Sequence, residues 1–248
     1  MTLEALGERG SPVGDPVPPP QFSGMDNQTL SFSVESHPLL RPSAFTTLFP
    51  RPLGEAPTPP RVLDLLRLDA PAPINRDEEL RMRVRDMLRH WGHKPAGRGK
   101  PASEYLVRAV DRGDLGSINL AVDICNVVSL HSGFPIALAD LDRARSPFRV
   151  GPGPDDGSYV FNASGQEMSL KGLICLFDAE GPCGNPVKDA QRIKTREQTI
   201  QTLTVVWGVA GFEDQRDAAV TWYRELLEES GGETAEVPLT DSASFSRS

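Results

Sequence analysis

The run from Asn119 to Asp142, NLAVDICNVVSLHSGFPIALADLD, constrains the fold of this chain more than any other segment. It is apolar enough to be buried, yet Asp123, Asn126 and Ser129 interrupt it at steps of three residues. Residues three and four apart share one face of an α-helix. We therefore predict a helix over residues 118–131 that is buried on nearly every side except one polar seam.

The second half of this run predicts where the helix stops. Gly133 suits the left-handed backbone conformation that ends many helices, and Pro135 cannot continue one. Residues 135–142 are then expected to form an extended strand. Two interpretations of the polar seam remain open. Asp123 and Asn126 hydrogen-bond neighbouring backbone groups, as buried polar side chains must, or the seam lines a pocket.

Patterns elsewhere predict one mixed α+β domain over residues 28–228. Apolar residues at helical spacing predict helices, and β-branched or alternating runs between turn residues predict strands. Ser103 is expected to cap the third helix, and the proline-studded segment up to Pro60 is expected to lie across the domain surface. The expected helices beside the one above span residues 61–68, 76–92, 104–112 and 213–230, and the expected strands span 29–34, 158–162, 166–170, 172–177 and 199–209.

Both ends of the chain have a composition typical of disorder. Twelve of the 23 prolines fall in residues 1–60, so residues 1–27 are predicted to be a disordered, proline-rich extension. Residues 229–248 combine acidic and small polar residues with few apolar ones. They are predicted to be a disordered acidic tail.

The net charge of -8 lies largely in residues 1–75 and 227–248, because residues 76–226 carry 20 basic against 21 acidic residues. Within this nearly neutral part, residues 81–112 carry nine Arg or Lys against three acidic residues. A polyanionic partner is therefore compatible with the overall charge. No apolar run is long enough to predict a membrane span, and the N-terminal residues lack the pattern of a signal peptide. Three cysteines do not make a disulfide framework. Together these features predict a soluble cytoplasmic protein.

The same run of residues resembles a known signature. It is similar to the helix–turn–strand motif of the B3/B4 domain, the editing module of the phenylalanyl-tRNA synthetase beta subunit, and the similarity extends over residues 100–210. The motif residues here are Val122, Asp123, Asn126, Gly133, Pro135 and Asp140. Because the chain is too short for the rest of such a subunit, it resembles freestanding B3/B4 proteins.

This resemblance implies a central, mostly antiparallel sheet flanked by helices. It also implies hydrolysis of the aminoacyl ester of mischarged tRNA, with tRNA as the partner and neither DNA nor a cofactor involved. The chain departs from the family pattern at two positions. Ala137 stands where the synthetase domains usually have a histidine, and Gln191 falls near their glutamate, with Asp189 close by.

Residues 181–195, GPCGNPVKDAQRIKT, contain the candidate catalytic group. Ester hydrolysis requires a positioned water molecule and donors for the developing oxyanion. Asp189 is the candidate for orienting the water. The predicted amino-acid pocket is lined by Asn126, Ser129 and His131, with Lys188, Lys194 and Thr195 at its mouth. The alternative is that residues 181–195 form an ordinary charged surface loop.

Residues 93–105, HKPAGRGKPASEY, predict a contact with RNA. Flexible backbone and positive charge suit phosphate binding without sequence readout, so Lys94, Arg98 and Lys100 are the candidates. The alternative is a solvated basic loop. No metal site is predicted, because His90 and His93 lack an evident third ligand.

Two functions therefore follow from the sequence. The first is a trans-editing hydrolase that deacylates mischarged aminoacyl-tRNA by water attack. The second is a non-catalytic module that senses an amino acid or binds tRNA or a translation partner.

Overall fold

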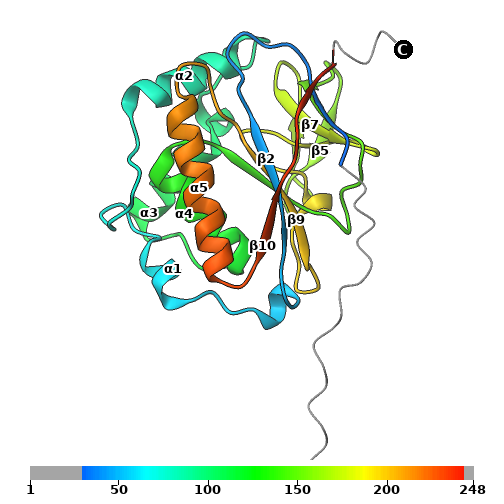
Figure 1. Cartoon of the computed structure of the whole chain (residues 1–248). Helices are drawn as coiled ribbons and strands as arrows, with labels where there is room; N and C mark the ends of the chain where they lie inside the picture. The colour runs from blue at the N-terminus through cyan, green and yellow to red at the C-terminus, as the bar shows by residue number, and fades with distance from the viewer. Residues whose placement is uncertain (1–29, 243–248) are drawn as a thin grey trace, which may run out of the picture.

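The computed structural model describes residues 30–242 and confirms the predicted α+β class (Figure 1). Within these residues the helices and strands build two main sheets and one small hairpin. The predicted proline-rich extension, residues 1–27, lies outside the described residues. So do residues 243–248 of the predicted tail.

The central helix forms as its sequence predicts. Helix α4 spans Leu120–Ser132, and the side chain of Asn119 caps it by accepting a hydrogen bond from the N–H of Val122 at 3.1 Å. Gly133 ends the helix with a φ of 84°, in the left-handed region. Strand β3, Ile136–Asp140, follows directly and is buried throughout.

Strand β3 is one edge of a four-stranded antiparallel sheet with the order β10-β2-β9-β3. The other strands are β2, Ser43–Leu48; β9, Gln201–Val206; and β10, Glu233–Glu236. Helix α5, Glu213–Glu229, packs against α4 and against this sheet. The rings of Phe45 on β2 and Tyr223 on α5 meet edge to face, with centroids 5.1 Å apart.

A second sheet has the order β11-β1-β4-β7-β8. Strand β1 runs parallel to β4 and β11, and the remaining pairs are antiparallel. These strands are β1, Phe32–Val34; β4, Phe148–Pro152; β7, Ile174–Asp178; β8, Gly181–Gly184; and β11, Thr240–Asp241. The pairing is therefore mostly antiparallel, as expected, but the strands divide between two sheets instead of forming one central sheet.

The remaining elements surround these sheets. Strands β5, Ser158–Val160, and β6, Glu167–Ser169, form an antiparallel hairpin. The other helices are α1, Pro60–Asp64; α2, Glu78–Arg89; α3, Ala102–Arg112; and the short 3₁₀ helices η1, Leu53–Glu55, η2, Gly97–Gly99, and η3, Gln191–Ile193. Figure 1 shows the α-helices gathered on one side of the four-stranded sheet, with β5 and β7 on the other.

Three local predictions differ from the structure. Residues 229–242 of the predicted tail contain β10 and β11. Strand β10 pairs with the open edge of β2, and β11 pairs with the open edge of β1. The segment before Pro60 contains strand β2, which fits between Pro42 and Pro50. Ser103 is buried inside α3 instead of capping it, since Pro101 occupies the N-cap position.

No helix within residues 30–242 is both long enough and apolar enough to cross a membrane.

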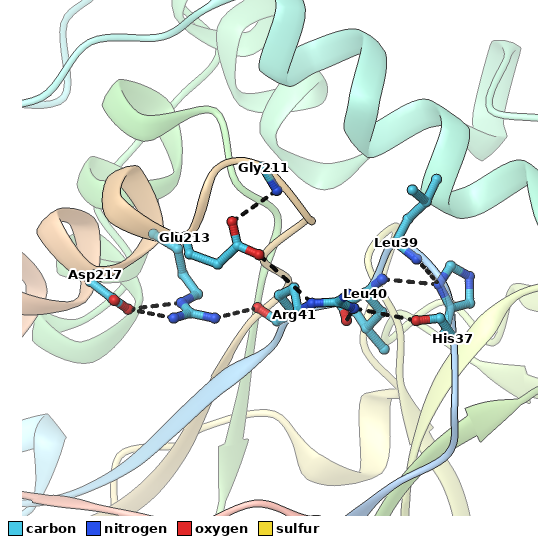
Figure 2. A network of polar contacts seen from close by, with 8 residues as sticks. His37, Leu39, Leu40, Arg41, Gly211, Glu213 and Asp217 are labelled. Carbon is cyan, nitrogen blue, oxygen red and sulfur yellow. Dashed lines mark hydrogen bonds and ion pairs between the residues drawn. The ribbon is translucent and has the colours of Figure 1, made fainter.

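The segment that leads into β2 is held by His37 (Figure 2). Its Nδ1 accepts hydrogen bonds from the N–H groups of Leu39, at 3.1 Å, and Leu40, at 3.0 Å. The adjacent Arg41 forms an ion pair with Glu213 at the start of α5, at 3.7 Å. Because Nδ1 acts as an acceptor, the ring of His37 is neutral in this arrangement. Burial lowers its pKa to about 4, and positive charge at His90 acts in the same direction.

We predict that His37 makes the fold sensitive to acid. The pKa of His37 is near 6.5 in the unfolded chain and about 4 in the folded protein. Between these pH values the unfolded chain therefore binds a proton that the folded protein does not. The free energy of unfolding should therefore fall as pH falls through this window, by about 1–3 kcal/mol. His37→Asn keeps an acceptor near Nδ1 and removes the titrating ring. Urea unfolding at pH 7.5 and 4.5 should show a smaller loss for the variant than for the wild type; equal losses would refute this assignment.

Candidate functional site

The turn between β8 and η3 is ordered by the side chain of Asn185, which is buried. Its Oδ1 accepts hydrogen bonds from the N–H groups of Val187, at 2.8 Å, and Lys188, at 2.9 Å. Its Nδ2 donates to the hydroxyl of Tyr159, which in turn donates to the carbonyl of Lys188 at 2.6 Å. The backbone of Lys188 is therefore held on both sides, at its N–H and at its carbonyl.

This turn meets α3, α4 and β3 around a cavity of about 240 Å³, which we call the inner cavity. Its walls are mainly apolar. The lining residues are Ala102, Tyr105 and Leu106 of α3; Cys125, Asn126 and Ser129 of α4; Ile136 of β3; and Val187 and Lys188 of the turn. Helix α4 and the turn between β8 and η3, residues 185–190, are far apart in the sequence, yet both line the same cavity. We call this turn the Lys-Asp turn, after Lys188 and Asp189.

A larger cavity of about 710 Å³, which we call the outer cavity, lies beside it. It is lined by Arg98, Gly99, Tyr105, Phe161, Gln166, Glu167, Met168 and Lys188. Tyr105 and Lys188 belong to the walls of both cavities. A ligand that extends from one cavity into the other must therefore pass these two side chains.

The ammonium of Lys188 stands where the two cavities meet. Its Nζ lies 3.9 Å from the ring centroid of Phe161 and 5.7 Å from that of Tyr105. Within residues 30–242 it forms no ion pair with a carboxylate. Burial lowers its pKa, and the positive charges of Arg98 and Lys194 act in the same direction. An ammonium without an anionic partner is suited to attract a carbonyl or phosphate oxygen of a ligand.

Asp189 is placed differently from what its candidate role requires. Its Oδ2 accepts a hydrogen bond from the N–H of Leu138 on β3, at 3.1 Å. Its Oδ1 is buried and has no hydrogen-bond partner among the described residues, and Asp189 lines neither cavity. Burial raises the pKa of Asp189 to about 7, against the opposing effects of the Leu138 N–H and the charge of Lys194. In this arrangement the carboxyl group ties the turn to β3.

The polar seam of α4 serves more than one purpose. The buried carboxylate of Asp123 accepts hydrogen bonds from the hydroxyls of Thr58 and Ser117, each at 2.6 Å, and from the N–H of Ile118 at 2.8 Å. Asn126 lines the inner cavity, and its side chain has no hydrogen-bond partner within residues 30–242. Asp123 is therefore hydrogen-bonded within the protein, as the first interpretation of the polar seam predicts. Asn126 lines a pocket, as the second interpretation predicts.

Ser129 combines both roles, because it lines the inner cavity while its hydroxyl donates to the carbonyl of Phe134 at 2.7 Å. Among the predicted pocket residues, the structure therefore brings together Asn126, Ser129 and Lys188.

The other predicted pocket residues lie elsewhere. His131 contacts the carbonyl of Leu65 through Nε2 at 2.8 Å, and its ring packs on Trp222, so it faces α1 and α5. Thr195 accepts a hydrogen bond from Asn119 at 3.1 Å, in a separate groove at the start of α4. Lys194 donates to the carbonyl of Phe161 at 2.7 Å, and burial lowers its pKa. It supports the wall of the outer cavity without lining it.

The predicted RNA-binding residues are spread around this site. Arg98 lines the outer cavity. Lys94 lines a separate hollow of about 340 Å³ together with Arg85, Arg89 and His93, and Lys100 lines none of these cavities. Within residues 30–242, no three His, Cys, Asp or Glu side chains gather in a way that could hold a metal ion.

Sequence reasoning did not single out Tyr105, Leu106, Phe161 or Asn185 as site residues. Asn185 carried a usable signal, since Asn before Pro and between two glycine- and proline-containing stretches is typical of a side-chain-capped turn. The other three carried none, because an apolar residue on a helix or hairpin is more often part of the core.

No protein-family model matches the chain, and no curated protein matches it. Among solved structures, it is similar to an N-terminal fragment of the phenylalanyl-tRNA synthetase beta subunit from Pyrococcus horikoshii, with a TM-score of 0.48 and 11% sequence identity. The match covers 87% of this chain and 53% of that one, so the chain spans about half the length of the fragment.

We predict that Asp189→Asn stabilises the protein at alkaline pH. Because the pKa of Asp189 is raised from about 3.8 to about 7, the folded protein holds a proton that the unfolded chain has released. Wild-type stability should fall as pH rises through this window, by about 1–3 kcal/mol, whereas the neutral amide of the variant should escape this loss. Asp156→Asn, at an exposed position, is the control. Thermal unfolding at pH 5 and 8 tests the prediction, and a variant with wild-type pH dependence would contradict it.

Proposed function

We propose that this protein deacylates mischarged aminoacyl-tRNA, with the aminoacyl ester held at the junction of the inner and outer cavities. The observation that carries this proposal is the position of Lys188, which lines both cavities and whose ammonium has no carboxylate partner within residues 30–242. The resemblance of residues 118–142 to the B3/B4 signature supports the same function. An aminoacyl group in the inner cavity and a nucleoside in the outer cavity would bring the ester bond to this ammonium.

In this proposal, water attacks the carbonyl carbon of the ester. Lys188 donates a hydrogen bond to the oxygen on which negative charge develops, which is where a preorganised donor lowers the barrier most. The ester C–O bond then breaks, and the ribose oxygen leaves and takes a proton from solvent. The protons of the attacking water pass to solvent, so that a ribose hydroxyl and the free carboxylate of the amino acid remain. Asn185 and Tyr159 hold the backbone of Lys188 in place, and Asp189 secures the same turn to β3.

The RNA backbone would approach from the side of the outer cavity. Arg98 lines that cavity, and Lys94 and Lys100 lie on the same basic segment. Contacts of this kind fix the position of a nucleic acid without reading its sequence.

A second candidate function is binding of an aminoacyl group or amino acid without hydrolysis. It is favoured by the walls of the inner cavity, on which the described residues place no carboxylate or imidazole that could act as a general base. Burial also raises the pKa of Cys125 to about 12, so its thiol is not a nucleophile at neutral pH.

We predict that Lys188→Met lowers deacylation about 10²-fold, the loss typical when one oxyanion donor is removed. The assay measures release of amino acids from a panel of mischarged tRNAs. Lys171→Met, at an exposed position that lines neither cavity, should retain wild-type activity. Ligand binding by the wild type without turnover of any ester, at high protein concentration, would reject hydrolysis in favour of the binding module.

We also predict that Arg98→Ala weakens tRNA binding about 3- to 10-fold and lowers the slope of log affinity against log salt concentration by about one. Loss of one phosphate contact releases one fewer counterion, which is the physical reason for the change in slope. Arg67→Ala is the control, because Arg67 is exposed, pairs with Asp69 and lines neither cavity. Filter binding of deacylated tRNA at several salt concentrations measures both quantities. Identical slopes for Arg98→Ala and wild type would exclude this contact.

A further inference from the structure

The inner cavity presents mainly apolar surface to a ligand. Leu106, Ile136 and Val187 are among the apolar residues that line it. The buried hydroxyl of Ser129 already donates its proton to the carbonyl of Phe134, and Cys125 stays a neutral thiol. At about 240 Å³ the cavity lies below the range of about 300–1,000 Å³ that drug-sized ligands occupy. Its chemistry and size both favour a small apolar group.

We propose that the inner cavity selects small aliphatic aminoacyl groups, of the valine or leucine type, over aromatic and cationic ones; this inference rests on the proposed binding of an aminoacyl ester. A cationic side chain would lose its hydration there beside the ammonium of Lys188, and the described cavity walls place no carboxylate to pair with it. An aromatic side chain is larger than an aliphatic one, and the cavity of about 240 Å³ already lies below the range that drug-sized ligands occupy. An aliphatic group loses no hydrogen bond on entry.

The free side chain of Asn126 explains how the α-amino group is recognised. Its amide oxygen has no partner among the described residues and can accept a hydrogen bond from an α-ammonium. The ammonium of Lys188 repels that group and attracts the ester carbonyl. Asn126 and Lys188 therefore orient the two polar ends of an aminoacyl group in opposite directions, with the aliphatic side chain between the walls of the cavity.

Leu106 is the side chain best suited to test the size of the cavity. It is half-buried on α3, whereas Ile136 is buried in the sheet and contributes to the core. Truncating Leu106 enlarges the cavity with little loss of core packing. Val110, on the same helix but outside the cavity walls, provides a matched truncation.

The first experiment measures binding of amino-acid amides, which stand in for the ester, by calorimetry on the full chain. L-Valinamide and L-leucinamide should bind about tenfold or more tightly than L-phenylalaninamide, L-tyrosinamide and L-lysinamide. Leu106→Ala should reduce this preference for aliphatic over aromatic amides, and Val110→Ala should leave it unchanged. Equal or tighter binding of the aromatic amides to the wild type, or no binding of any amide, overturns the inference.

The second experiment tests Asn126 with a ligand that lacks the amine. For the wild type, replacing L-leucinamide by 4-methylpentanamide should weaken binding about tenfold, the loss expected when a buried acceptor is left unpaired. For Asn126→Leu the two ligands should bind alike; an unchanged difference in that variant overturns the role of Asn126.

These outcomes separate the inference from the proposed function. Aliphatic selectivity in binding without ester hydrolysis supports the inference while rejecting the deacylase. Hydrolysis of mischarged tRNA that is fastest for a tyrosyl ester retains the deacylase and overturns the inference.

Discussion

Helix α4 can be buried on nearly every side because its polar side chains find hydrogen-bond partners inside the protein. Asp123 receives three hydrogen bonds, Ser129 donates to the carbonyl of Phe134, and His131 meets the carbonyl of Leu65. An unpaired polar group at any of these positions would oppose burial of the helix. Asn126 is the exception along this stripe, and it is also the position at which the helix faces a cavity. The unpaired side chain and the site thus coincide.

The parts of the fold that could be predicted are those governed by local chemistry. The spacing of apolar residues and the Gly133–Pro135 pair defined α4 and β3. Helix α2 likewise lies inside the predicted range 76–92, with Asp77 as its cap. Strand β10 could not be predicted in the same way. Three of its four residues are exposed and two are acidic, and it exists because α5 returns the chain to the open edge of β2.

The candidate site shows the same division. The sequence analysis placed α4 and the Lys-Asp turn at one predicted site, and in the structure residues of both line the inner cavity. The sequence could not show which of Lys188 and Asp189 reaches the cavities and which is buried, because the exposure of adjacent residues depends on tertiary packing. The side chain of Lys188 reaches the two cavities, whereas Oδ1 of Asp189 is sealed inside the protein. Burial then moves the pKa of Asp189 far enough that its neutral form is well populated near pH 7. The residue expected to carry negative charge in the site is therefore a structural tie.

The parallel pairing of β1 with β11 joins residues that are some two hundred positions apart, with Ser33 opposite Thr240. Strand β10 likewise pairs with the distant strand β2, with Glu233 opposite Leu48. Contacts of such long sequence separation are slow to form, because a large loop must close before they contribute stability. During synthesis on the ribosome, neither sheet can acquire its last strand until nearly the whole domain has emerged. Early intermediates therefore expose the edges of β1 and β2, and these edges are where pairing with another chain would compete with folding.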